Sequence, residues 1–565
     1  MTFRPTLNRP PAACSAGLAA ALVAAVTACS SPAPQARSGA FETAPAADGQ
    51  PALPPIEEAT VAQLQGWLAE GRLTSRALVS FYLARIAAID HGDNGLKSVI
   101  ELNPGALAVA DLRDAERRTG KVHGPLHGIP VLLKDNIATA GTGPEVMETT
   151  AASLALVGHR PARDAHLVER LRTAGAIVLG KTNLSEWANW RSTHSSSGWS
   201  GRGGQTRNPY ALDRNACGSS SGSGAAIAAN LAAIAVGTET DGSIVCPSTV
   251  NGLVGLKPTL GRVSRSGIIP IAASQDTAGP MTRTVADAAL LLDALAGRDD
   301  ADPATKALTG ARASECFHCG LAAASLQGVR IGVLRKLADF LPSVESRFDE
   351  AITALKAAGA VIVDDVELPN QGDYDDDEFL VLQVEFKDGI AKYLAALDAD
   401  APKTLAALIA FNAREAAQEM PYFGQELFTM SDTVGPLTDA KYRKARARSL
   451  KLAGRDGIDA ALKKHKLDVL IAPTGAPAWL TDHTLGDHVI GGGISSAPAV
   501  SGYPHLTVPM GFVDGLPVGL SFVGPAWSEA RLLRYGHAYE QATKLRRPPT
   551  LPASNTIATA TSVER

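Results

Sequence analysis

The chain has 565 residues, of which 45% are hydrophobic and 19% charged, and its formal net charge is −4. A chain of this size can bury a large core, and its length allows one to four domains. The lack of a basic excess argues against a nucleic-acid partner, and no apolar run in the body of the chain is long enough to span a bilayer.

The N-terminus has the pattern of an export signal. Arg4 and Arg9 precede an Ala/Leu/Val-rich stretch, residues 16–28, which ends in Val-Thr-Ala-Cys at Cys29. Basic residues, an apolar stretch and small residues before a cleavage point are typical of signal peptides. The ending resembles the lipobox of bacterial lipoproteins, which predicts a signal peptide over 1–28 and an exported protein of the periplasm or cell envelope, anchored to a membrane only through lipidated Cys29. An ordinary secretory signal and an alanine-rich leader are the alternatives.

Both ends of the mature chain have the composition of flexible segments. Residues 29–55 are rich in Ala, Pro and Ser, which predicts a tether. Residues 546–565 are rich in Pro, Thr and Ala, which predicts a flexible tail. The folded domain is therefore expected over residues 56–545.

Within this domain, short apolar runs alternate with helical patterns. A helical period covers 58–90, with Thr74 as an N-cap. Strands are expected at 129–133, 176–179, 234–237, 329–334, 361–363, 469–472 and 518–523, and intervening helices at 163–174, 283–296, 344–358 and 527–543. This alternation predicts an α/β architecture around a largely parallel sheet. The region 367–440 breaks the pattern and contains an acidic run, 373–378, which fits a solvated loop and helix start or a cap over an active site.

One segment matches the sequence pattern of a nucleotide-binding loop by chance. Gly175 to Thr182 fits the P-loop pattern GxxxxGK[ST] letter for letter. Its four interior residues are Ala-Ile-Val-Leu, which predict a strand and leave no loop to bind a phosphate. A nucleotide site is therefore not expected here.

A second segment fits the nucleophile elbow of α/β-hydrolases. Residues 218–222 match G-x-S-x-G, which makes Ser220 a nucleophile, with Asp468 and His505 as partners by chain order. This interpretation leaves a conspicuous lysine, Lys134, and a second glycine-serine turn at Ser243 unexplained, so another arrangement is favoured.

That arrangement uses three segments together. Lys134 ends the apolar run 129–133, Cys-Gly-Ser-Ser-Ser-Gly-Ser-Gly occupies 217–224, and Thr-Glu-Thr-Asp-Gly-Ser-Ile occupies 238–244. Amide hydrolysis needs an activated nucleophile, a base and donors for the oxyanion. No histidine lies in these segments, so Lys134 is the candidate base. Neutralising a free lysine at pH 7 costs about 4.6 kcal/mol, a penalty that burial reduces. A salt bridge from Lys134 to Asp135 is the structural alternative.

In this order, the three segments resemble the amidase signature family. The resemblance implies that Ser243 is the nucleophile, and that Ser219 follows a cis peptide and relays a proton between Ser243 and Lys134. The oxyanion hole is then expected from the backbone N–H groups of Thr240, Asp241, Gly242 and Ser243. The resemblance implies no metal or organic cofactor.

The resemblance extends over about 60–545 and implies a single large α/β/α domain with a mixed, mostly parallel sheet. The segments 185–189, 203–210 and 238–247 are similar to peptide amidases, which release ammonia from C-terminal peptide amides. The chain is therefore predicted to be a serine amidohydrolase that acts on a small-molecule or short peptide amide through an acyl-Ser243 intermediate. The alternatives are an amidase or esterase of small aliphatic or aryl substrates, an amidotransferase A-type subunit, and a non-catalytic envelope protein.

The cysteines give one further expectation. In an exported protein, Cys316 and Cys319 predict a tight disulfide loop. A metal site would need two more ligands, of which His318 supplies one. Cys217 and Cys246 flank the two serine segments, and the sequence leaves open whether they pair.

Overall fold

The computed structural model describes residues 53–141, 143–489 and 492–551. The predicted signal peptide, Cys29 and nearly all of the predicted tether lie outside this range, as do residues 552–565 of the predicted tail. Residues from Pro54 onward form one unit. Arg546 in this unit forms an ion pair with Glu58 at 2.7 Å, so the folded part of the chain continues past residue 545.

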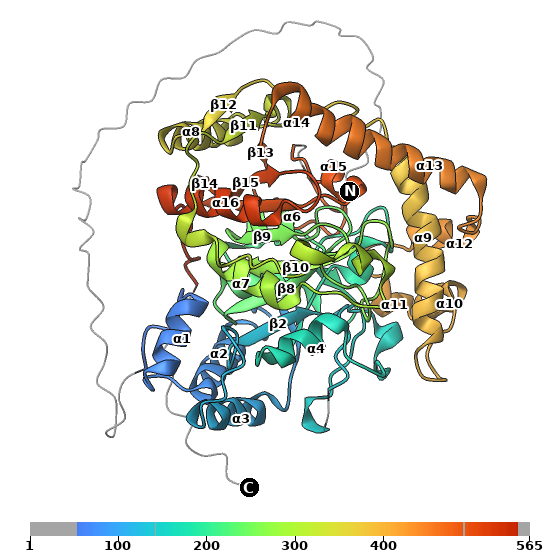
Figure 1. Cartoon of the computed structure of the whole chain (residues 1–565). Coiled ribbons are helices and arrows are strands. Elements are labelled where there is room, and N and C mark those ends of the chain that lie inside the picture. The colour runs from blue at the N-terminus through green and yellow to red at the C-terminus, as the bar shows by residue number, and fades with distance from the viewer. Residues whose placement is uncertain (1–52, 142, 490–491, 552–565) are drawn as a thin grey trace, which may run out of the picture. The chain divides into compact units, whose positions relative to one another are not determined.

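An 11-stranded mixed sheet runs through the centre of the domain (Figure 1). In spatial order its strands are β1 (Val99–Leu102), β3 (Ile177–Thr182), β2 (Pro130–Lys134), β8 (Ile234–Glu239), β10 (Thr277–Thr282), β9 (Val254–Lys257), β14 (His505–Val513), β15 (Leu516–Val523), β13 (Val469–Pro473), β11 (Arg330–Val333) and β12 (Val361–Val363). Two small two-stranded sheets lie outside it, β4 (Trp199–Ser200) with β5 (Gly204–Gln205) and β6 (Arg207–Asn208) with β7 (Ala211–Asn215).

The predicted mixed α/β sheet is confirmed, but the expectation that it is mostly parallel is wrong. Parallel pairing is confined to β2 with β3 and β8, and to β11 with β12 and β13. The remaining neighbours are antiparallel, including the hairpin β14–β15. Strands β9, β10 and β14 supply much of this antiparallel centre, and Gly255, Gly279, Pro280, Pro509 and Gly511 within them weaken the sequence signal of a strand.

Helices cover the sheet. Helices α4, α7, α16 and α8 form a continuous row in which each contacts the next. Helices α5 and α6 contact each other; α5 packs on β2 and β8, and α6 packs on β9, β14 and β15. The helices of the main body are α1 (Val61–Ala69), α2 (Ser75–Ile89), α3 (Ala106–Arg118), α4 (His166–Thr173), α5 (Ser221–Ala228), α6 (Val245–Val250), α7 (Val285–Leu295), α8 (Pro342–Ala357), α14 (Asp459–His465), α15 (Ser496–Ser501) and α16 (Glu529–Thr543). The α/β/α arrangement is that expected from the sequence.

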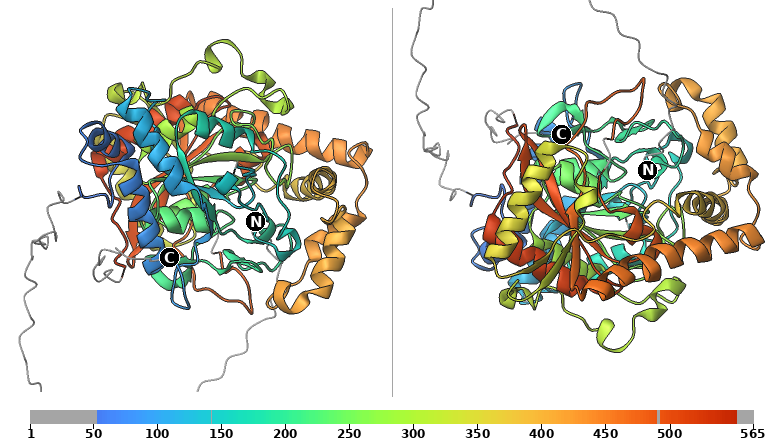
Figure 2. Two further views of the ribbon diagram at one scale, coloured as in Figure 1. Left: turned by 90° about the horizontal axis from the view of Figure 1, so that it is seen from below. Right: turned by 90° about the horizontal axis from the view of Figure 1, so that it is seen from above.

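The region that breaks the strand–helix alternation forms a group of helices on one side of the domain (Figures 1 and 2). It comprises α9 (Asp375–Ala395), α10 (Leu405–Arg414), α11 (Ala416–Glu419), α12 (Glu426–Thr433) and α13 (Ala440–Leu450), followed by a π-helical segment (Lys451–Ile458). We call α9–α13 the side helices. The apolar faces of α9, α10 and α12 pack on Trp187, Trp190, Ile269 and Ile271 of the main body, so these three helices share a core with the segments around the site.

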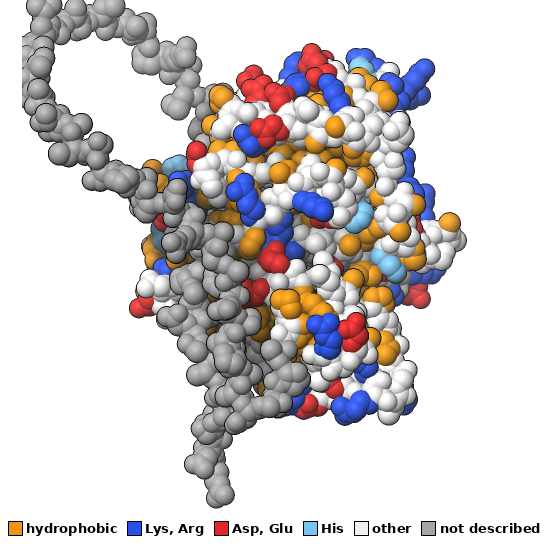
Figure 3. Space-filling view, turned by 90° about the vertical axis from the view of Figure 1, so that its left-hand side faces the viewer, with side chains coloured by type: hydrophobic (Ala, Val, Ile, Leu, Met, Phe, Trp, Pro, Cys, Tyr) orange, Lys and Arg blue, Asp and Glu red, His pale blue; other side chains and the backbone are white. Residues whose placement is uncertain are grey.

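The distribution of surface charge and the character of the helices match two expectations from the composition: no basic excess and no apolar run that could span a bilayer. On the face shown in Figure 3, basic side chains are interspersed with acidic and apolar ones. Among the described residues, no helix combines the length and the apolar character that a membrane crossing requires.

Candidate active site

Lys134 lies at the end of a strand in the parallel part of the sheet. It is the last residue of β2, all of whose residues are buried because β3 and β8 flank the strand and helix α5 packs on it. Its Nζ lies 2.8 Å from Ser219 Oγ. The same Nζ lies 2.9 Å from Thr238 Oγ1 and 3.2 Å from the Thr238 carbonyl oxygen, at the end of β8. The lysine therefore faces the serine that was expected to relay its proton.

Burial changes the acid–base properties of this lysine. Lys134 is fully buried, and burial lowers the pKa of its ammonium to about 7, against the opposing influence of the Glu239 and Asp276 carboxylates. Among the described residues, no carboxylate lies within ion-pair distance of Nζ. A neutral amine beside a hydroxyl can accept its proton, so the pair has the geometry of a base and a proton relay.

Residues 217–220, called the serine loop below, precede α5 and hold Ser219 in place. The Gly218–Ser219 peptide is cis, as the family resemblance implies. Ser219 is fully buried, and its carbonyl accepts a hydrogen bond of 3.1 Å from the backbone N–H of Ser185. Gly222 in the first turn of α5 lies so close to Ser98 and Asn183 that a Cβ would come within 2.3 Å of a backbone oxygen. The small residues of this segment therefore serve close packing.

The nucleophile-elbow alternative is wrong. Ser220 is buried, and its Oγ donates to the Thr238 carbonyl at 3.0 Å. His505 lies elsewhere in the sheet, where its Nε2 is 2.6 Å from Ser521 Oγ, and burial lowers the pKa of its imidazole to about 3. Asp468 accepts the backbone N–H of Arg330 at 2.8 Å. These three residues do not form a triad.

Ser243 lies in the turn between β8 and α6, and residues 240–243 are called the nucleophile turn below. Ser243 is 8% exposed, and Gly242 has a positive φ of 78°, which glycine adopts without strain. Among the described residues, the backbone N–H groups of 241–243 donate to no protein acceptor. The turn thus presents free donors beside a hydroxyl, the arrangement that stabilises an oxyanion.

Two contacts connect the serine loop to the nucleophile turn and to the start of α6 that follows it. The N–H of Ser220 donates to the Ser243 carbonyl at 3.1 Å. A disulfide joins Cys217 to Cys246 with a Cα–Cα distance of 6.0 Å, which answers the question left open by the sequence. In the structure a second disulfide links Cys316 to Cys319, the pair expected to form a tight loop. Outside the sequence expectations, Thr240 Oγ1 donates to half-buried Asp276 at 2.7 Å, which anchors the start of the turn.

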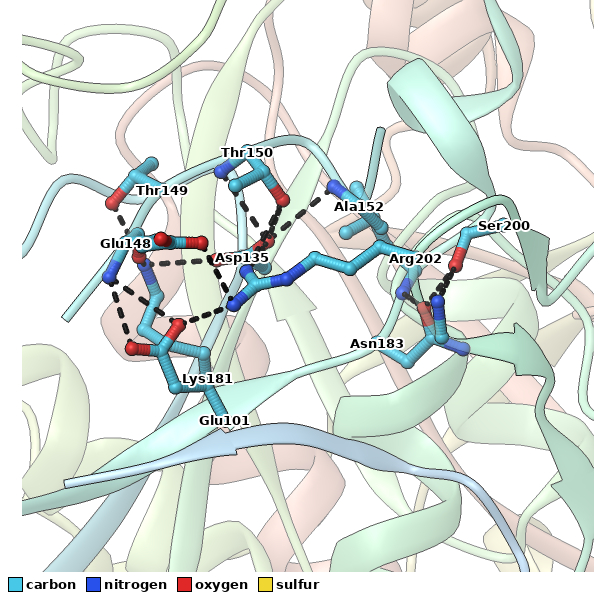
Figure 4. A network of polar contacts seen from close by, with 12 residues as sticks. Glu101, Asp135, Glu148, Thr149, Thr150, Ala152, Lys181, Asn183, Ser200 and Arg202 are labelled. Atoms are coloured by element: carbon cyan, nitrogen blue, oxygen red, sulfur yellow. Dashed lines mark hydrogen bonds and ion pairs between the residues drawn. The ribbon is translucent and has the colours of Figure 1, made fainter. Parts of the chain in front are cut away.

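Beside Lys134 lies a network of buried charges (Figure 4). Asp135 forms ion pairs with Lys181 of β3 at 3.2 Å and with Arg202 at 3.3 Å. Asp135 is therefore the partner of Lys181, and the predicted alternative of a Lys134–Asp135 salt bridge is wrong. Lys181 belongs to the segment that matches the P-loop expression; it is buried within a strand and also donates to the carbonyls of Ile137 and Glu148.

Comparisons with known proteins identify relatives of this chain. The amidase family profile matches residues 77–533. A crystal structure of native peptide amidase from Stenotrophomonas maltophilia is 54% identical, with a TM-score of 0.83 over 88% of this chain and 99% of that one.

The chain belongs to the amidase family. A probable amidase of Arabidopsis thaliana is 39% identical over 503 residues, 87% of this chain and 92% of the relative. A glutamyl-tRNA(Gln) amidotransferase subunit of Symbiobacterium thermophilum is 36% identical over 489 residues, 82% of this chain and 95% of the relative. This amidase is thus a hydrolase of amides, with the fold of the peptide amidases.

The Asp135 network generates a stability prediction. Asp135→Asn leaves Lys181 buried with its carboxylate partner removed, so we expect the free energy of unfolding to fall by about 3 kcal/mol or more. Urea unfolding measures this change. A double variant with Asp135→Asn and Lys181→Met removes both charges and should recover part of the loss. Asp349→Asn removes the exposed partner of Arg335 and should change stability by about 1 kcal/mol or less; equal losses for Asp135→Asn and Asp349→Asn would contradict the prediction.

Proposed function

We propose that this amidase removes the C-terminal carboxamide of short peptides as ammonia, through an acyl-Ser243 intermediate. The observation that carries the mechanism is the 2.8 Å contact between the buried Lys134 amine and Ser219 Oγ, which lies in a loop bonded to the nucleophile turn. The substrate class is supported by the 54% identity to peptide amidase over most of the chain.

The proposed reaction begins with proton transfer. Ser243 Oγ attacks the carboxamide carbon and gives its proton to Ser219 Oγ, whose own proton moves to the neutral Lys134 amine. The N–H groups of the nucleophile turn, expected over residues 240–243, stabilise the negative oxygen of the tetrahedral intermediate. The lysine then returns the proton through Ser219 to the departing nitrogen, which leaves as ammonia. Water then enters, gives a proton to the same relay and attacks the acyl carbon. The acyl–Oγ bond breaks, the relay returns the proton to Ser243 Oγ, and the peptide acid leaves.

Removing the nucleophile should abolish turnover. We expect Ser243→Ala to lower kcat for ammonia release from an N-acetylated dipeptide amide by about a thousandfold or more, and Lys134→Met to be nearly as severe because Ser219 loses its proton acceptor. Far-UV circular dichroism should show an unchanged fold in the Ser243 variant. Retained turnover by a clean Ser243→Ala preparation would overturn the mechanism. If neither the wild type nor the variants release ammonia but a fluorophosphonate still labels Ser243 in the wild type, the nucleophile is retained and the substrate is another amide or ester. If Ser243 is not labelled either, a non-catalytic envelope protein is favoured.

The pH profile tests the base. Lys134 must be neutral to accept a proton and its pKa is about 7, so kcat/KM for the acetylated substrate should rise with pH through about 7 and then level off. The negative charge of Asp276 raises the pKa of Lys134, so Asp276→Asn should move the midpoint to lower pH. A profile that is flat between about pH 5.5 and 8.5 would show that another group is the base.

We also infer that the enzyme is exported and anchored through Cys29. Arg4, Arg9 and the apolar stretch before Cys29 motivate this inference, and two disulfides in the described part of the chain support an oxidising compartment. Cells that express the full chain should incorporate labelled palmitate into the protein and retain it in the membrane fraction. Cys29→Ser should lose the label. Unlabelled full-length protein in the cytoplasm would refute the inference.

A further inference from the structure

The first turn of α9 brings a carboxylate close to the nucleophile turn. Glu378 is 6% exposed, and its Oε1 accepts a hydrogen bond of 2.8 Å from Gln275 Nε2. The same Nε2 donates to the carbonyl of Thr240 at 3.4 Å. A single glutamine side chain therefore connects the carboxylate of a side helix to the turn that carries Ser243.

A second carboxylate belongs to the nucleophile turn itself. Asp241 is half-buried, and its Oδ2 accepts from Ser496 Oγ of α15 at 2.9 Å. Its Oδ1 is buried and has no hydrogen-bond partner among the described residues. Because Asp241 is two residues from Ser243, their Cα atoms are at most about 7 Å apart.

A buried tyrosine between α9 and α15 has a hydroxyl without a hydrogen-bond partner among the described residues. Tyr374 precedes α9, is 1% exposed and packs with Val500 of α15, the helix that also binds Asp241. Burial, followed by the charges of Glu378 and Asp241, raises the pKa of the Tyr374 hydroxyl. Within the described chain the hydroxyl makes no hydrogen bond. An unsatisfied buried polar group costs about 1–3 kcal/mol, which a ligand group can recover.

The cluster lacks a positive charge. Among the described residues, no lysine, arginine or histidine forms an ion pair with Asp241 or Glu378, whereas the neighbouring Asp377 pairs with Arg448. Burial, followed by the charge of Asp241, raises the pKa of the Glu378 carboxyl to about 8. A cation nearby would favour the ionised form of the Glu378 carboxyl.

We propose that Asp241 and Glu378 form a subsite for a positively charged group of the substrate, held beside the reacting carboxamide. This inference rests on the proposed function and specifies its substrates. In a dipeptide amide the N-terminal ammonium lies up to about 7 Å from the C-terminal carboxamide, a reach comparable to the separation of Asp241 from Ser243. A lysine or arginine side chain at the last residue has a similar reach. The Tyr374 oxygen accepts a hydrogen bond from either cation.

Paired substrates test the subsite at about pH 7, where a peptide α-ammonium is still mainly charged. Glycyl-phenylalanine amide is compared with its N-acetyl form, and N-acetyl-glycyl-lysine amide with the norleucine analogue. For each pair, kcat/KM for ammonia release is measured with the wild type and with Glu378→Gln. We expect the wild type to favour the cationic member of at least one pair about tenfold through a lower KM, and Glu378→Gln to remove most of that preference. The pair that responds identifies the source of the cation.

Asp377→Asn is the matched control, because it removes the adjacent carboxylate that already has Arg448 as its partner. Its substrate ratios should equal those of the wild type. If Glu378→Gln still releases ammonia and leaves the ratio of kcat/KM between the cationic and the neutral substrate unchanged, the subsite is wrong and the proposed function stands. If none of the four peptide amides releases ammonia, the proposed substrate class and the subsite both fail.

Discussion

The candidate site depends on one buried amine without a paired carboxylate. Lys134 ends a strand buried between two parallel neighbours and within the helix layers. Among the described residues, the close partners of its Nζ are hydroxyl and carbonyl oxygens. Burial penalises the ammonium form, and the carboxylates of Glu239 and Asp276 act from farther away and limit the shift. This balance leaves the pKa of the lysine, about 7, close to physiological pH. In the proposed reaction, Ser219 would otherwise have no acceptor for its proton.

The fold holds the reacting segments in register. Strand β8 ends between the serine loop and the nucleophile turn, and Thr238 at that end contacts both Lys134 Nζ and Ser220 Oγ. Glu239 accepts the N–H groups of Ile244 and Val245, which fixes the start of α6 after Ser243. The Cys217–Cys246 disulfide joins the two segments covalently. The ends of the interior strands β2 and β8, the start of α6 and the disulfide therefore together position the Ser243 hydroxyl and the Lys134 amine.

Part of this arrangement could be predicted from the sequence. The motifs around Lys134, Ser219 and Ser243 are local, so their residue types and order indicate both the family and the fold. Strand direction is not local: β10, with Gly279 and Pro280, pairs antiparallel with β8 although its sequence lacks a strand pattern. The disulfide between Cys217 and Cys246 also depends on tertiary proximity. Glu378 could have been found from helical periodicity, because it lies on the same buried stripe as Leu382 and Glu385, but the acidic run around it suggested a solvated helix start.

Three buried lysines show that nearby groups decide whether a buried amine can act as a base. Lys181 is as buried as Lys134, but its Nζ lies 3.2 Å from the Asp135 carboxylate, and removing its proton would leave that carboxylate with one counter-charge fewer. Lys257 in β9 is also fully buried, and burial lowers the pKa of its ammonium to about 8, with Glu239 opposing. Lys257 donates to the carbonyl of Pro258, whereas Lys134 lies against a serine hydroxyl. Burial alone therefore does not make a lysine a base. The amine must also lack a paired carboxylate and must contact a hydroxyl that can pass on a proton. Of these three lysines, Lys134 meets both conditions.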